Sequence, residues 1–104
     1  MAKIPSELKT SVLLVQAAEK CSELAQACLK FVIKLDGTNP TPKGYDELTT
    51  SLIEEMADVY LSLSTLQAKM RIDTKEIDSI FIQKLRRWSG RLAENDADEE
   101  NEND

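Results

Sequence analysis

Carboxylates occur in pairs at two places in the sequence, at spacings that put them on one face of a helix. Glu19 and Glu23 are four residues apart, and Glu55 and Asp58 are three residues apart, with Glu54 beside them. Residues three or four positions apart are neighbours on a helix surface. Two facing helices would therefore direct several carboxylate oxygens at one point. Oxygens of this kind are the ligands that Mg²⁺ or Mn²⁺ prefers.

The second pair lies inside an apolar stretch, LIEEMADVYLSL at residues 52–63. An unpaired buried carboxylate is costly, so either solvent or a bound cation has to balance these charges. On a helical wheel the acids lie at the borders of the apolar stripes or outside them. This placement fits a cleft between two helices and an ordinary solvated surface equally well, so the pairs alone leave both interpretations open.

Two long helices would position these acids. The apolar spacing predicts a first helix over 8–35, with Ser6 as its N-cap, and a second helix over 47–70. Between them, residues 36–46 contain two glycines and two prolines and predict a loop. A short connection of this kind makes the two helices antiparallel neighbours.

A third helix is expected to begin after Asp73, its predicted N-cap, and to run to about residue 92. Beyond it, residues 93–104 contain no apolar residue larger than Ala, and we expect a disordered acidic tail there. No strand pattern is found. The sequence therefore predicts an all-α fold, an antiparallel bundle of three main helices, with one domain over 1–92.

The apolar stripes are too wide for a single chain to cover. The first predicted helix would be about 42 Å long at 1.5 Å per residue, and its apolar face extends over more than one side. We therefore expect oligomerisation to complete the bundle, as a homodimer or a homotetramer. Phe31 and Trp88 are expected to be core residues more often than parts of a binding site.

The composition excludes several classes of function. The net charge of -6 argues against nucleic-acid binding, and no run of 18 apolar residues is available to span a membrane. Without any His, the chain cannot form a Ser-His triad or a Cys/His zinc site. Cys21 and Cys28 would lie about 10 Å apart on one helix, too far for a disulfide. We expect both to be small buried residues of a cytoplasmic protein.

The order of the acidic motifs resembles that of the MazG-like group of all-α nucleoside triphosphate pyrophosphohydrolases. That family carries E-E-x-x-E on one helix and E-x-x-D on the next, and the chain has EKCSE at 19–23 and EMAD at 55–58. The sequence NPTP in the loop and the run KLRRWSGRL in the third helix are similar as well. The resemblance covers about residues 10–92.

The resemblance implies a site that binds Mg²⁺ or Mn²⁺ together with a nucleoside triphosphate. It implies cleavage between the α- and β-phosphates, giving a nucleoside monophosphate and pyrophosphate. The residues carried over from the family pattern are the metal ligands Glu23, Glu55 and Asp58, the catalytic candidate Glu19, and the phosphate-binding candidates Lys84 and Arg91. A solvated helix end is an equally good interpretation of the last two cations.

Lys20 departs from the family pattern, because it stands where the second glutamate of E-E-x-x-E is expected. Its ammonium group would repel a metal ion and would pair with Glu23 or Glu55 in the metal's place. One interpretation is an inactive relative. The other is a weaker metal site held by the remaining acids, with Glu54 or Glu19 helping and Lys20 reaching a phosphate.

Three hypotheses follow from the sequence. The chain is a metal-dependent nucleotide pyrophosphohydrolase, or a MazG-like helical protein that has lost catalysis and retains a nucleotide-binding or regulatory role, or an unrelated helical interaction module. A carboxylate site that binds metal only in the folded state would stabilise the fold when Mg²⁺ or Mn²⁺ is added. Under the third hypothesis no specific stabilisation is expected.

Overall fold

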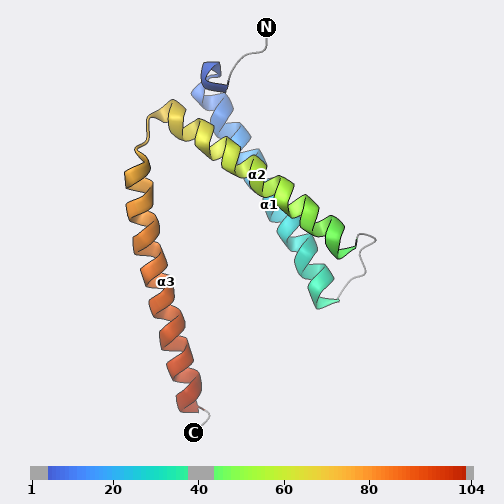
Figure 1. Ribbon diagram of the computed structural model, residues 1–104, viewed down its shortest axis with the longest axis vertical. Coiled ribbons are helices and arrows are strands. Elements are labelled where there is room, and N and C mark those ends of the chain that lie inside the picture. Colours follow the sequence, from blue (N-terminus) through green and yellow to red (C-terminus); the bar gives the residue numbers. More distant parts are fainter. Residues whose placement is uncertain (1–4, 38–43, 103–104) are drawn as a thin grey trace. The chain divides into compact units, whose positions relative to one another are not determined.

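The chain folds into helices throughout the part that the computed structural model describes, residues 5–37 and 44–102, with side chains described up to Asp96 except for that of Ser6. A short 3₁₀ helix, η1 (Pro5–Glu7), precedes three long α-helices. These are α1 (Thr10–Asp36), α2 (Tyr45–Met70) and α3 (Thr74–Glu102) (Figure 1). The described residues contain no strand, which confirms the predicted all-α class.

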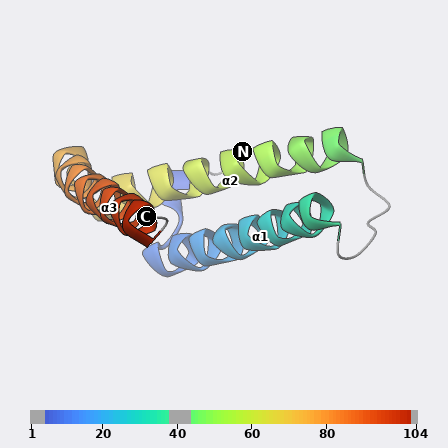
Figure 2. The same cartoon turned by 90° about the horizontal axis from the view of Figure 1, so that it is seen from below.

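The helices α1 and α2 form an antiparallel hairpin, which is seen from two directions in Figures 1 and 2. Gly37 ends α1 in the left-handed conformation at φ 65, where a residue without a Cβ carries no steric penalty. Its N–H donates to the carbonyl oxygen of Ile33. The central residues of the predicted loop, 38–43, lie outside the described residues.

The core of the hairpin is small. Four apolar side chains are buried among the described residues, and they come in equal numbers from the two helices: Leu13 and Ala17 from α1, Leu48 and Val59 from α2. The polar site described below therefore lies between helices that share only a thin apolar contact.

Helix α3 belongs to a second compact unit, which begins at Ile72, whereas η1, α1 and α2 belong to the first. The backbone N–H of Lys75 donates to Asp73 Oδ1 at 2.9 Å, which confirms Asp73 as the N-cap. The helix continues from Ala93 to Glu102, a segment that we expected as an acidic tail. Ala and Glu are strong helix formers, and neither Gly nor Pro interrupts the segment. The three-helix bundle and the domain boundary at residue 92 stay predictions.

Two sequence-based expectations are wrong. Lys9, and not Ser6, occupies the N-cap position of α1, because residues 5–7 form a separate 3₁₀ turn before the helix begins. Cys21 and Cys28 are free, as expected, but they are exposed. The apolar stripe of α1 is wider than the strip that α2 covers, so these positions are exposed in the single chain.

Trp88 is also exposed, with 64% of its surface accessible, and is not the core residue that we expected in this chain. Phe31 is half-buried and packs edge-to-face on Tyr45, with ring centroids 5.1 Å apart. The aromatic pair joins the end of α1 to the start of α2. Among the described residues, no helix has both the length and the apolar character that a membrane crossing requires.

Candidate metal centre

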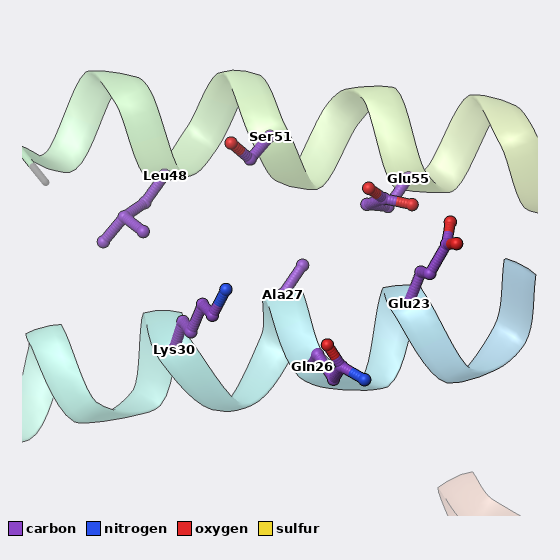
Figure 3. A pocket seen from close by; sticks show the side chains of 7 residues that line it. All are labelled: Glu23, Gln26, Ala27, Lys30, Leu48, Ser51 and Glu55. Atoms are coloured by element: carbon purple, nitrogen blue, oxygen red, sulfur yellow. The ribbon is translucent and has the colours of Figure 1, made fainter.

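Three carboxylates converge between α1 and α2. Glu23 lies on α1, and Glu55 and Asp58 lie one turn apart on α2. Each offers one carboxylate oxygen, and the three oxygens lie within 4.8 Å of one another. Glu23 and Glu55 point toward each other across the hairpin (Figure 3). We call these three residues the acid cluster, and they are the three that the resemblance predicts as metal ligands.

Within the acid cluster, one carboxylate oxygen of Glu55 has an unusual environment. Its Oε2 atom is shielded from solvent and has no hydrogen-bond partner among the described residues. Burial raises the pKa of Glu55 above its ordinary value, and the neighbouring charges of Glu23 and Asp58 raise it further. The ionised form of this carboxylate is thus disfavoured by its surroundings, and a cation would relieve the cost.

Lys20 is the cation that the sequence places at the acid cluster. Its Nζ donates a hydrogen bond to Glu23 Oε2 at 3.4 Å and lies 3.9 Å from Asp58 Oδ2. The hydrogen bond to Glu23, together with the charges of Glu23 and Asp58, raises the pKa of Lys20 above its ordinary value. The pair with Glu23 was expected from the sequence. The contact with Asp58 was not, because periodicity along each helix does not give the register between helices.

A pocket of about 160 Å³ opens beside the acid cluster, between the two helices. Glu23 and Glu55 line one end of it, and Lys30 reaches into it from α1 (Figure 3). Gln26 and Ser51 add an amide and a hydroxyl to the lining. The pocket therefore presents both negative and positive groups to a bound molecule.

Sequence reasoning overlooked these polar residues, although the signal was present. Gln26 and Lys30 follow Glu23 by three and seven positions, and Ser51 precedes Glu55 by four. These spacings put each residue on the same helix face as an acid of the cluster. Extending the face of each acidic motif by two turns would have identified them.

Glu19, the catalytic candidate, lies outside the acid cluster. It is exposed on α1 and lines a larger hollow, of about 410 Å³, together with Lys20 and Asp58. Glu19 therefore shares this hollow with Lys20 and Asp58, which form an ion pair. Glu54 is exposed on α2 and does not contribute to the acid cluster.

The phosphate-binding candidates Lys84 and Arg91 lie on α3. They line one shallow hollow on that helix, together with Arg87 and Trp88. Three cations beside an exposed indole ring make this the most basic surface of the second unit. Lys84 and Arg91 thus lie on the same face of α3 and line the same hollow.

The residues of the acid cluster fit a divalent cation by two criteria. The donors are all carboxylate oxygens, which suit Mg²⁺ and Mn²⁺. The shielded Oε2 of Glu55 has no partner, as expected for an atom whose partner is a ligand. Clusters of exposed acids also occur without a metal, so the arrangement defines a candidate and a set of ligands to test.

Comparison with known proteins adds no relative to this picture. No protein-family model, no curated protein and no solved structure matches the chain.

Proposed function

We propose that the chain is a metal-dependent nucleotide pyrophosphohydrolase of the MazG-like group. It would cleave a nucleoside or deoxynucleoside triphosphate into the monophosphate and pyrophosphate. The observation that supports this function best is the convergence of the Glu23, Glu55 and Asp58 oxygens within 4.8 Å, from two motifs more than thirty residues apart in sequence. The two motifs carry the resemblance, and they meet in the fold.

In this proposal Glu23, Glu55 and Asp58 hold Mg²⁺ or Mn²⁺. When bound, such an ion neutralises phosphate oxygens and lowers the pKa of a coordinated water. The protein contributes carboxylates that are already gathered from both helices, and one oxygen of Glu55 is shielded from solvent.

The remaining polar groups of the hairpin have roles in binding and proton transfer. Glu19 is our candidate for orienting the attacking water and accepting its proton. Lys30 lines the pocket beside the acid cluster, where its ammonium group would contact a phosphate of the substrate. The resemblance assigns Lys84 and Arg91 to the substrate phosphates as well, and this assignment stays a prediction.

The overall reaction is a hydrolysis at the α-phosphorus. The oxygen of water forms a new bond to this phosphorus, and the bond from the α-phosphorus to the oxygen that bridges to the β-phosphate breaks. That oxygen leaves with pyrophosphate, and the proton of the water is released by way of the general base. A nucleotide-processing enzyme of this kind would act in the cytoplasm, where nucleoside triphosphates are abundant.

A second candidate function is supported by Lys20. Because this residue pairs with two of the three acids, the chain would also suit a MazG-like protein that binds nucleotides or regulates a partner without catalysis. In that protein the ammonium group would hold the place of the metal permanently.

We also propose that a second copy of the chain covers the apolar faces that the single chain exposes, as a homodimer or a homotetramer. Leu14 and Val15 on α1 and Ile53 and Leu61 on α2 are all exposed. Symmetric self-association buries equivalent faces of identical chains, which is the commonest way to cover them.

The test is pyrophosphate release from a panel of ribo- and deoxyribonucleoside triphosphates with Mg²⁺ or Mn²⁺. We expect turnover by the native chain and a loss of at least about 100-fold in Glu55→Ala, because a ligand is removed. The matched control is Glu47→Ala, which removes an exposed carboxylate from the first turn of the same helix. It should retain activity.

The Lys20→Glu variant distinguishes the two candidates. If the native chain is silent and Lys20→Glu releases pyrophosphate, the chain is the non-catalytic relative on an intact scaffold. If both are silent with every nucleotide and both metals, the pyrophosphohydrolase proposal is refuted.

A further inference from the structure

Lys20 neutralises the acid cluster unevenly. Its Nζ lies 3.4 Å from Glu23 Oε2 and 3.9 Å from Asp58 Oδ2, whereas Glu55 Oε2 has no partner among the described residues. The ammonium group thus lies within 4 Å of two of the three acids. Its charge acts on Glu55 more weakly, and the Oε2 atom of Glu55 is shielded from solvent.

Lys20 offsets only one of the three negative charges that the cluster carries when all three carboxylates are ionised. A divalent cation would favour this fully ionised form, which the surroundings of Glu55 otherwise disfavour. A dication that contacts the Glu23 and Asp58 oxygens would, however, lie close to the Lys20 ammonium, and like charges at such distances repel strongly.

The structure also offers Lys20 another position. It lines the hollow of about 410 Å³ that also contains Glu19, Gln16 and Ser62, so its side chain has open space beside it. A lysine side chain is flexible over four methylene groups, so its ammonium group can turn toward such a space.

We propose that Lys20 is a tethered counter-cation: it occupies the Glu23–Asp58 side of the acid cluster in the metal-free chain, and a divalent cation displaces it on binding. The inference rests on the proposed metal site and deepens it, because it makes one residue of this chain the determinant of metal affinity. Lys20 then weakens metal binding and stabilises the metal-free hairpin through the same two contacts.

The test measures binding of Mn²⁺ to the full chain at fixed pH and ionic strength, for the native protein and for Lys20→Met. We expect Lys20→Met to bind Mn²⁺ at least about tenfold more tightly. A nearby charge commonly changes a proton-binding constant by a factor of about ten or more, and we expect a similar effect on the binding of a metal cation. In the absence of metal, the same variant should unfold at a lower temperature than the native chain.

Two further variants serve as controls. Lys34→Met removes the same charge from the last turn of α1, where no described carboxylate pairs with it, and should leave both quantities unchanged. Lys20→Arg retains the charge and should retain the weaker Mn²⁺ affinity. A general effect of net charge would appear equally in Lys20→Met and Lys34→Met and would overturn the inference.

The outcomes separate this inference from the proposed function. If the native chain binds Mn²⁺, Glu55→Gln loses the binding and Lys20→Met binds no more tightly than the native chain, the metal site stands and the counter-cation role is refuted. If neither the native chain nor Lys20→Met binds Mn²⁺, the metal site itself is refuted, and the role of Lys20 with it.

Discussion

The hairpin of α1 and α2 and the helix α3 have equally clear apolar stripes, but only the hairpin buries any of its own. Leu13 and Leu48 are 2% and 3% exposed, whereas no described side chain of α3 is buried or half-buried. Apolar periodicity therefore predicts a helix and its apolar face. It does not predict whether another part of the same chain packs on that face. Most helical stability in proteins comes from packing of that face, and the described part of α3 has no such packing within its own unit.

The two regions differ in their charges in the same way. The hairpin gathers acids where solvent is partly excluded, and the pKa of Glu55 is raised as a result. On α3 the charged side chains described, up to Asp96, are exposed, and a group of cations around Lys84 and Arg91 precedes a run of acids that begins at Glu94. Charges in the hairpin thus converge from two helices, whereas the described charged side chains of α3 are exposed to solvent.

Truncating the core should give the largest effect and tests the difference in burial directly. We expect Leu48→Ala to lower the free energy of unfolding by about 2–4 kcal/mol, because it leaves a cavity in a core of few residues. Leu85→Ala on α3, where the side chain is 48% exposed, should cost less than about 1 kcal/mol at concentrations where the chain is monomeric. Urea denaturation followed by circular dichroism measures both. Equal costs under these conditions would show that the face of α3 is covered within the chain.

Adding a charge to the apolar face of α3 should weaken self-association. Phe81 is 64% exposed in the single chain and lies near the middle of the stripe. If a second copy covers it, Phe81→Lys should weaken self-association at least about tenfold, because the ammonium group would be buried without a partner. Sedimentation equilibrium measures the effect, with Gln83→Lys on the opposite side of the helix as control. Association unaffected by Phe81→Lys would exclude this face from the interface.

The raised pKa of Glu55 should appear as a dependence of stability on pH in the metal-free chain. A raised folded-state pKa contributes stability below the ordinary value of 4.5, and this contribution is lost as pH rises through the folded-state value. Glu55→Gln removes the titration, so its stability relative to the native chain should increase as pH rises above about 4.5. The gain should be smaller than the loss caused by Leu48→Ala.

Thermal unfolding of the two proteins across this pH range measures the difference. Glu54→Gln removes the neighbouring carboxylate, which is exposed on α2, and serves as the control. A gain of the same size in Glu54→Gln would mean that net charge, and not the acid cluster, is responsible.

The smallest effect is expected where the two regions join. Arg71 follows α2 in the left-handed conformation, at φ 55, which is strained for a residue with a Cβ. Arg71→Gly should raise the free energy of unfolding by up to about 1 kcal/mol. Arg86→Gly, inside α3, should instead reduce helix content, because glycine is unfavourable there by about 1 kcal/mol. A higher free energy of unfolding for Arg71→Gly, together with a lower helix content for Arg86→Gly, would confirm the backbone explanation. A lower free energy of unfolding for Arg71→Gly would contradict it.

The sequence predicted the helices well because their signals are local. The end of α2 at Met70 and the cap at Asp73 depend on residues within a turn of each other. The start of α1 was placed too early because serine is a preferred N-cap residue, whereas residues 5–7 form a 3₁₀ turn before α1 begins. The helical extension from residue 93 onward was missed for a related reason, since acidic composition suggested disorder while helix propensity favoured continuation.

The sequence identified which acids form the candidate site, but it did not predict the contacts between the two helices that carry them. The order of the two acidic motifs named Glu23, Glu55 and Asp58, and the fold brings all three together. The contact between Lys20 and Asp58 joins two helices, and the pattern within either helix carries no information about their relative shift. The exposure of Cys21 and Cys28 was missed because we expected the whole apolar stripe of α1 to be covered, whereas α2 covers only part of it.

The bridge from Lys20 to Asp58 also has a mechanical consequence for the hairpin. Sliding of the two helices past each other by one turn would displace them by about 5.4 Å. Such a slip would break the ion pair at 3.9 Å and disperse the carboxylates. Because the side chains of Lys20 and Asp58 are 36% and 45% exposed, solvent screens this pair, and it favours the observed register only weakly. A metal ion that replaced Lys20 would take over this alignment and would hold it with three ligands instead of two.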